Sequence, residues 1–174
     1  MIIGITGKSG CGKSTYARKL GEDTGFYVVD IDKIGHKILN LPELREEFVR
    51  IFGNSVIKNN SIDRKYIGDL IFENRHLYED LTKIVWTKVK SEIDSILSEH
   101  EHVILEWILL PHTHYWKLCD TKILVTCEDI SRISRVLLRD NISKEYLSKR
   151  DFASIDYSEI TFDKVIDTTE GGYT

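Results

Sequence analysis

Apolar residues recur along the chain in two patterns, as short continuous runs and as stripes with helical spacing. The short runs are rich in β-branched residues, which is typical of strands buried on both faces of a sheet. We expect strands at residues 2–6, 26–29, 103–110, 122–126 and 164–167. The second of these runs ends at Asp30-Ile31-Asp32.

Stripes with a spacing of three and four residues predict helices between the strands. The first predicted helix begins at Ser14. Further helices cover residues 42–53, 64–74, 77–98 and 129–139, and another follows Ser143. Pro42 just inside a helix start and Gly53 at its end support the second of these. In helix 129–139 we expect four residues to face inward: Ile130, Ile133, Val136 and Leu137. Residues 54–60 predict a polar turn or a short hairpin.

Strands that alternate with helices predict an α/β fold whose five-stranded, mostly parallel sheet is covered by helices on both faces. The ligand should then lie at the carboxyl ends of the strands. We expect one domain over residues 1–174. A mainly helical insertion at about residues 36–100 should form a cap that binds a second substrate, and residues 140–160 should form a lid.

Composition excludes several classes of function. With 41% hydrophobic and 30% charged residues, the 174-residue chain has the content of a soluble globular protein. A net charge of −4 argues against a broad nucleic-acid surface, and the apolar run at residues 103–110 is too short to span a membrane. The number of cysteines is odd and their spacing does not suit a metal site, which favours reduced thiols in the cytoplasm. The first strand starts at once, so we expect no signal peptide, which also favours the cytoplasm. Composition does not indicate an oligomeric state.

Residues 7–15, Gly-Lys-Ser-Gly-Cys-Gly-Lys-Ser-Thr, fit the phosphate-loop pattern G-x-x-x-x-G-K-[ST] between a strand and a helix. Glycines allow the backbone to approach a phosphate closely, and the N–H groups at the helix start favour an anion. We therefore predict a nucleotide site with Mg²⁺, in which Lys13 reaches the β- and γ-phosphates and the Ser14 hydroxyl helps to hold the metal.

Two further groups of residues are candidates for phosphoryl transfer. If alternation continued through Asp30 and Asp32, both carboxylates would point to the same side, where one of them could act as a base or position Mg²⁺. Arg132, Arg135 and Arg139 recur at helical spacing, and Arg150 follows; we favour phosphate contacts for the last three over a solvated helix face.

Glu106 interrupts an apolar run, where it could hold a water on Mg²⁺, pair with a buried cation, or lie at a solvent-facing edge. The pairs His100/His102 and His112/His114 have a spacing that occurs in metal sites, but they lack nearby cysteines. We expect no structural metal there.

In order along residues 1–169, the chain resembles the dephospho-CoA kinase family. The resemblance lies in the phosphate loop, Val29-Asp30-Ile31-Asp32, Phe52-Gly53, Ile62-Asp63-Arg64 with Ile71-Phe72, Arg139-Asp140 and Val165-Ile166-Asp167. It implies a P-loop kinase fold and ATP-dependent phosphorylation of the ribose 3′-hydroxyl of dephospho-CoA. By position, Asp32 matches the catalytic aspartate, and Arg139 and Arg150 match arginines near the lid and phosphates. The ATP site would comprise Lys8, Ser9, Gly10, Cys11, Gly12, Lys13, Ser14 and Thr15.

The sequence departs from the family pattern at three places: Trp86-Thr87 in place of His-Pro, residues 150–154 in the lid, and a chain that continues for only a few residues after the last strand. A kinase for a different nucleoside, nucleotide or cofactor precursor is therefore the alternative. A nucleotide-dependent switch is disfavoured: Asp32-Lys33-Ile34-Gly35 fits D-x-x-G, but it follows the loop too closely and no N-K-x-D comes later.

Overall fold

The computed structural model describes residues 1–59, 61–144, 147 and 156–169. The chain divides into two compact units, one formed by Met1–Asp30 with His100–Thr174 and the other by Ile31–Glu99.

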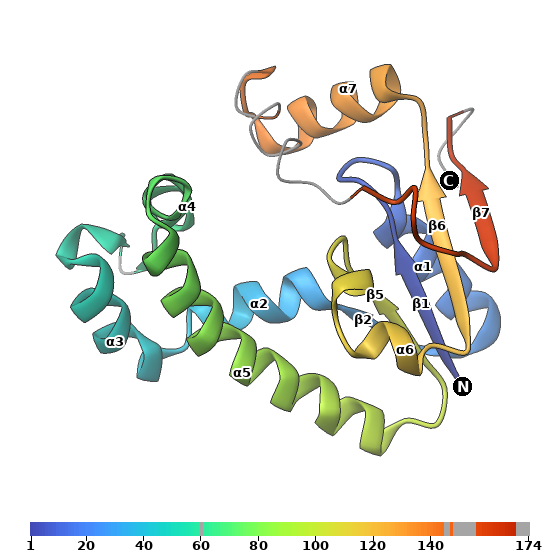
Figure 1. The fold of residues 1–174 in the computed structure, drawn as a ribbon, viewed down its shortest axis with the longest axis horizontal. Coiled ribbons are helices and arrows are strands. Elements are labelled where there is room, and N and C mark those ends of the chain that lie inside the picture. The colour runs from blue at the N-terminus through green and yellow to red at the C-terminus, as the bar shows by residue number, and fades with distance from the viewer. Residues whose placement is uncertain (60, 145–146, 148–155, 170–174) are drawn as a thin grey trace. The chain divides into compact units, whose positions relative to one another are not determined.

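The first unit is built on a five-stranded sheet in which every neighbouring pair of strands is parallel (Figure 1). In spatial order the strands are β2 (Tyr27–Asp30), β5 (Val103–Glu106), β1 (Ile2–Thr6), β6 (Thr121–Thr126) and β7 (Lys164–Asp167). The predicted α/β fold with a five-stranded parallel sheet is confirmed. Because all strands run in one direction, their carboxyl ends meet at one edge.

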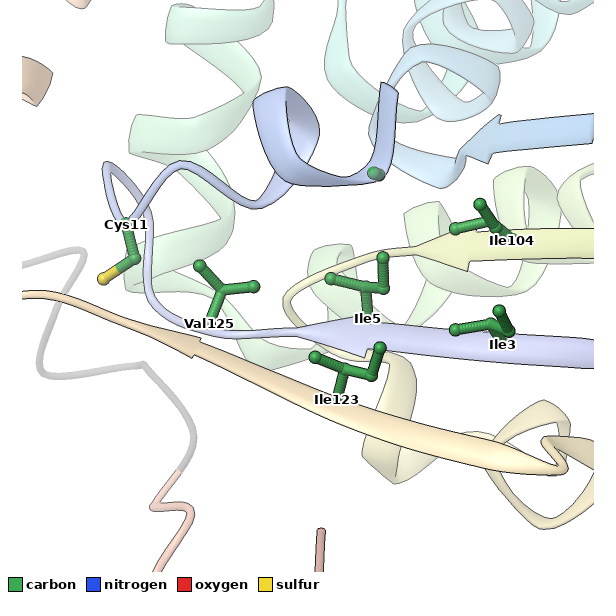
Figure 2. Packing of buried hydrophobic residues seen from close by; sticks show 7 residues of the cluster. Ile3, Ile5, Cys11, Ile104, Ile123 and Val125 are labelled. Atoms are coloured by element: carbon green, nitrogen blue, oxygen red, sulfur yellow. The ribbon is translucent and has the colours of Figure 1, made fainter. Parts of the chain in front are cut away.

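The core of this unit surrounds the central strand β1. Figure 2 shows Ile3 and Ile5 of β1 with Ile104 of β5 and Ile123 of β6. Ala17 of α1 (Lys13–Thr24) belongs to the same cluster.

The opposite face of β1 is covered by a later part of the chain. A Cβ on Gly4 would lie 2.6 Å from the Cys119 sulfur and 3.0 Å from the Trp116 ring. Trp116 lies in the short helix α6 (Tyr115–Leu118). Because alternate residues of a strand face opposite sides, β1 is buried on both faces, as its continuous apolar run predicts.

The apolar run at residues 103–110 forms a shorter strand than its pattern predicts. β5 ends at Glu106, and the Trp107 amide still donates a hydrogen bond to the Ile5 carbonyl at 3.1 Å. The chain then turns into a 3₁₀ helix, η2 (Leu110–His112), whose Leu110 side chain is buried. A continuous apolar run indicates that a segment is buried, and a turn packed on the core buries its side chains as well as a strand does.

In its described residues, the second unit is helical apart from two short antiparallel strands. Its elements are α2 (Ile31–Leu39), α3 (Pro42–Phe52), η1 (Asn54–Val56), β3 (Ile57–Lys58), β4 (Ser61–Ile62), α4 (Arg64–Glu73) and α5 (Arg75–Glu99). Pro42 occupies the first turn of α3, and Gly53 ends the helix with φ of 80° and an N–H bond to the Val49 carbonyl. At the start of α4 the Asp63 carboxylate accepts from the Tyr66 amide at 3.0 Å. These local signals explain why the helices were predictable.

No helix within the described ranges has the length and apolar character that a membrane span requires.

Candidate functional site

The loop between β1 and α1 has a backbone shape that requires glycine. Gly7, Gly10 and Gly12 have φ of 144°, 86° and 81°. A Cβ on Gly7 would lie 2.1 Å from the Val125 carbonyl oxygen, and one on Gly10 would lie 2.7 Å from the Arg132 carbonyl oxygen. The loop therefore packs tightly against its neighbours while its backbone follows a path that L-residues rarely adopt.

Helix α1 begins at Lys13, directly after the left-handed Gly12. The side chain of Lys13 is only 9% exposed, and its Nζ lies 3.3 Å from the Lys8 carbonyl oxygen and 3.7 Å from Glu106 Oε1. The Ser14 hydroxyl donates to Glu106 Oε2 at 3.0 Å. Glu106 ends β5 and is 3% exposed. Of the three possibilities for Glu106, the structure shows pairing with a buried cation, and it brings the loop's lysine and serine to one carboxylate.

Helix α7 (Asp129–Asp140) contacts the loop through two arginines. The buried Arg132 donates from Nε to the Asp129 carboxylate at 3.0 Å and from Nη1 to the Ser9 carbonyl at 3.4 Å. Arg139 donates from Nη2 to Ser9 Oγ at 3.3 Å, and it binds both oxygens of Asp140, at 2.6 and 3.0 Å. The guanidinium group of Arg139 is therefore held near the loop.

The predicted inner face of α7 is partly wrong. Val136 is fully buried, but Ile130 is 81% exposed, whereas Arg132 is buried. The Ser9 carbonyl and the Asp129 carboxylate supply acceptors for the buried guanidinium, so a charged residue occupies a position that an apolar stripe alone would not indicate.

Arg135 reaches the loop indirectly, through a threonine. Its Nη1 and Nη2 lie 3.3 and 2.9 Å from Oγ1 and the carbonyl oxygen of Thr168. Thr168 is 2% exposed, and its Oγ1 lies 3.0 Å from the Cys11 carbonyl oxygen and 3.1 Å from that of Thr126. Thr168 was not predicted from the sequence. The available signal was a hydroxyl residue directly after a strand that ends at the same sheet edge as the loop.

Tyr157 was also missed by the sequence analysis. Its Oη donates to the Ile108 carbonyl at 3.2 Å, and the Thr6 hydroxyl donates to the same carbonyl at 3.0 Å. Burial raises the pKa of Tyr157 above its ordinary value, so the phenol stays protonated and can donate at neutral pH. These groups lie where β1 leads into the loop.

All three cysteines are free thiols, and Cys11 lies on the loop itself. The Cys11 and Cys127 sulfurs are 3.4 Å apart. Burial, followed by the hydrogen bond with Cys127, raises the pKa of the Cys11 thiol to about 12. Cys11 is therefore an uncharged packing residue at neutral pH, where it belongs to the core cluster of Figure 2.

Strand alternation predicted that Asp30 and Asp32 end the same strand, but in the structure only Asp30 belongs to it. Asp30 ends β2 and is in register with Glu106 of β5, whereas Asp32 lies in the first turn of α2, in the second unit. The chain enters a helix at Ile31, so the two-residue period of a strand no longer applies. A carboxylate in a first helical turn is favoured by the helix dipole, which explains this placement locally.

The structure describes some of the remaining predicted positions and not others. Trp86 of α5 is half-buried. Arg150 and much of the predicted lid at residues 140–160 lie outside the described residues. His100 stacks on Tyr27, and His102 stacks on Phe26. In the described part of the chain, no cluster of three or more His, Cys, Asp or Glu side chains is arranged to hold a metal ion.

Comparison with known proteins connects this geometry to one family. The family model described as dephospho-CoA kinase matches residues 1–167. A dephospho-CoA kinase of Fusobacterium nucleatum is 37% identical over 153 residues, covering 86% of this chain and 78% of the relative.

Two solved structures match nearly the whole chain. A Thermus thermophilus protein, TT1252, has a TM-score of 0.83 and 28% identity, covering 98% of this chain and 90% of the other. Dephospho-CoA kinase from Campylobacter jejuni has a TM-score of 0.60 and 27% identity, covering 97% and 88%.

Proposed function

This chain belongs to the dephospho-CoA kinase family, and from that premise we propose how its residues phosphorylate the ribose 3′-hydroxyl of dephospho-CoA. It is an ATP-dependent small-molecule kinase that converts dephospho-CoA to coenzyme A. The observation that supports the mechanism best is the convergence of Lys13 and Ser14 on the buried Glu106 beneath the glycine loop.

The loop binds the phosphates of ATP. Its backbone N–H groups and the start of α1 favour an anion, and Lys8, Ser9, Gly10, Cys11, Gly12 and Thr15 complete this part of the site. The Lys13 ammonium reaches the β- and γ-phosphates when ATP is bound, in exchange for part of its contact with Glu106. Glu106 holds Lys13 in place and supplies the counter-charge, because a charge that is buried without a partner destabilises the fold.

The residues present fit a magnesium ion. Ser14 offers a hydroxyl oxygen and Glu106 a carboxylate, the oxygen donors that Mg²⁺ prefers, and this ion takes its remaining ligands from phosphates and water. Ser14 would hold Mg²⁺ directly, with Glu106 orienting the serine. When bound, the ion neutralises the charge of the transferring phosphates.

Asp32 acts as the base that accepts the proton of the acceptor hydroxyl. The support is the sequence resemblance together with the position of Asp32 two residues after Asp30, which ends a strand at the loop's edge of the sheet. Arg139, held at Ser9 of the loop, and Arg150 stabilise the negative charge of the transferring phosphoryl group.

The second unit, with the predicted insertion at residues 36–100, binds the acceptor, and residues 140–160 act as a lid. We place the reaction in the cytoplasm, in keeping with free thiols, and expect neither nucleic acid nor a membrane as a partner, in keeping with a net charge of −4.

An assay of ATP consumption over a panel of acceptors tests this function. The panel contains dephospho-CoA, phosphopantetheine, nucleosides and nucleoside monophosphates, with Mg²⁺ and with excess chelator, and Lys13→Ala is the inactive control. Turnover of dephospho-CoA with phosphate on the ribose 3′ position, located by phosphorus NMR, is expected. An inert dephospho-CoA and an active nucleoside or nucleotide would instead support the alternative acceptor.

A further inference from the structure

We propose that Thr168 is a positioning residue for nucleotide binding, because its hydroxyl holds the Cys11 carbonyl and thereby orients the Gly12 N–H toward the phosphates. The inference rests on the proposed ATP site at the loop. It adds to that site a residue that lies 157 positions after Cys11 in the chain, directly after β7.

The backbone of Thr168 is held in place independently of its side chain. Its amide donates to the Thr126 carbonyl at 2.9 Å, which continues the pairing of β7 with β6 by one residue. Its side chain is buried, and Oγ1 lies 3.0 Å from the Cys11 carbonyl oxygen. The hydroxyl therefore joins the carboxyl end of the sheet to the loop.

Arg135 determines which role the hydroxyl can play. A guanidinium only donates, so Oγ1 accepts from Nη1 of Arg135 at 3.3 Å and keeps its single hydrogen for a carbonyl. The two carbonyls within reach belong to Cys11 and Thr126, and that of Thr126 already accepts from the Thr168 amide. The hydroxyl hydrogen is thus best used on Cys11.

The peptide between Cys11 and Gly12 transmits this contact to the nucleotide site. A trans peptide is planar, so its N–H points opposite to its C=O. With the Cys11 carbonyl held by Thr168, the Gly12 N–H points away from Thr168, to the side of the loop that receives phosphate. Gly12 has φ of 81°, and the atoms nearest to a Cβ added there belong to the Thr168 side chain, with Oγ1 at 3.7 Å. Glycine permits the orientation, and the threonine maintains it.

Two other carbonyls of the loop are held in the same manner. Lys13 Nζ donates to the Lys8 carbonyl at 3.3 Å, and Arg132 Nη1 donates to that of Ser9 at 3.4 Å. Side chains thus bind the Lys8, Ser9 and Cys11 carbonyls, and the Cys127 Sγ lies 3.9 Å from the Gly10 carbonyl oxygen. The Cys11 N–H donates to the Lys8 carbonyl at 3.2 Å, so the other N–H groups of the loop, that of Gly12 among them, are the ones we expect to meet an anion.

Thr168→Val removes the hydroxyl and keeps the shape of the side chain, so it is the direct test. Calorimetry with ATP–Mg²⁺ should show binding about three- to tenfold weaker than in the unchanged protein, the scale of one lost hydrogen bond. Thr168→Ser, which keeps the hydroxyl, should restore affinity to within about twofold. In steady-state assays the KM for ATP should rise while the KM for dephospho-CoA stays constant. Thr168→Ala supplies a second hydroxyl-free variant if valine disturbs folding.

Thr169→Val is the matched control. The Thr169 hydroxyl donates to Asp167 at 2.6 Å and accepts from the Glu128 amide at 2.9 Å, and neither partner belongs to the loop. This variant should bind ATP like the unchanged protein.

The outcomes separate this inference from the proposed function. If Thr168→Val and Thr168→Ala are folded and bind ATP normally while the unchanged protein phosphorylates dephospho-CoA, the inference is wrong and the function stands. If ATP binding weakens as expected but dephospho-CoA is inert, the inference stands and the function fails. If the unchanged protein does not bind ATP, both are wrong.

Discussion

Replacing Glu106 by glutamine tests the buried charge pair that organises the site. Glu106→Gln removes the negative charge and keeps a side chain of nearly the same size, with one oxygen to accept the Ser14 hydroxyl. The charge of Lys13 then remains in a site where both side chains are less than 10% exposed. We expect a loss of both stability and turnover.

The size of the effect on stability follows from the distance. Unit charges 3.7 Å apart attract each other by about 4.5 kcal/mol at an effective dielectric constant of 20, before desolvation is counted. Removing one partner of a buried pair typically costs about 3–5 kcal/mol, and the amide retains part of the hydrogen bonding, so a loss of about 3 kcal/mol is expected. For a chain of this length, that corresponds to a Tm lower by about 6–12 °C.

The chain offers a control with almost the same geometry at its surface. Glu92 lies 3.8 Å from Lys37, but the two side chains are 47% and 74% exposed. Glu92→Gln should change the free energy of unfolding by less than about 1 kcal/mol, because water screens the pair. Calorimetric melting of both variants, without nucleotide and at one salt concentration, provides the comparison.

Turnover gives a second readout. Glu106→Gln should lower kcat for dephospho-CoA phosphorylation by about 10–100-fold, the usual effect of losing a group that orients a metal ligand. Equal Tm shifts in the two variants would refute the claim that burial makes the Lys13–Glu106 pair strong. A normal kcat in Glu106→Gln would remove Glu106 from the proposed mechanism.

Three further predictions concern other residues. Asp32→Asn should lower kcat by about a hundredfold or more with ATP affinity unchanged, and Asp30→Asn should have a smaller effect; reversed effects in steady-state kinetics would assign the base to Asp30. Arg139→Ala should lower kcat more than it weakens ATP binding in calorimetry, because the charge it meets develops during transfer; equal losses would indicate uniform binding instead. Burial raises the pKa of Cys11 and Cys119 from 9.0 to about 12, so the unfolded chain releases these protons first and stability should fall as pH rises above about 9. Urea unfolding at about pH 8 and pH 10 should show a smaller decline in Cys119→Ala than in the unchanged protein.

The sequence by itself determined the features that depend only on residues close to one another in the chain. The glycine loop was recognisable because its fixed positions are adjacent and stand between a β-branched run and a helical stripe. Pro42 and Gly53 marked the ends of α3 because capping acts within one turn. Periodicity also gave the order of strands and helices, and hence the fold class.

Sequence periodicity failed where a residue's environment comes from a distant segment. The run at residues 103–110 reported burial without distinguishing a strand from a packed turn, and the stripe of α7 assigned Ile130 to the core instead of Arg132. Asp30 and Asp32 were separated by a helix start that strand alternation could not anticipate.

The tertiary structure alone decided which side chains meet at the loop. Sheet order places β5 and β6 on either side of β1, so that Glu106 pairs with Lys13 and Ser14. The pairing of β7 with β6 brings Thr168 to the Cys11 carbonyl. These contacts join segments far apart in the chain, and local propensity carries no information about which parallel strands become neighbours. Only the assembly of the complete sheet selects them, because each strand pairs with partners that the chain reaches after long crossovers.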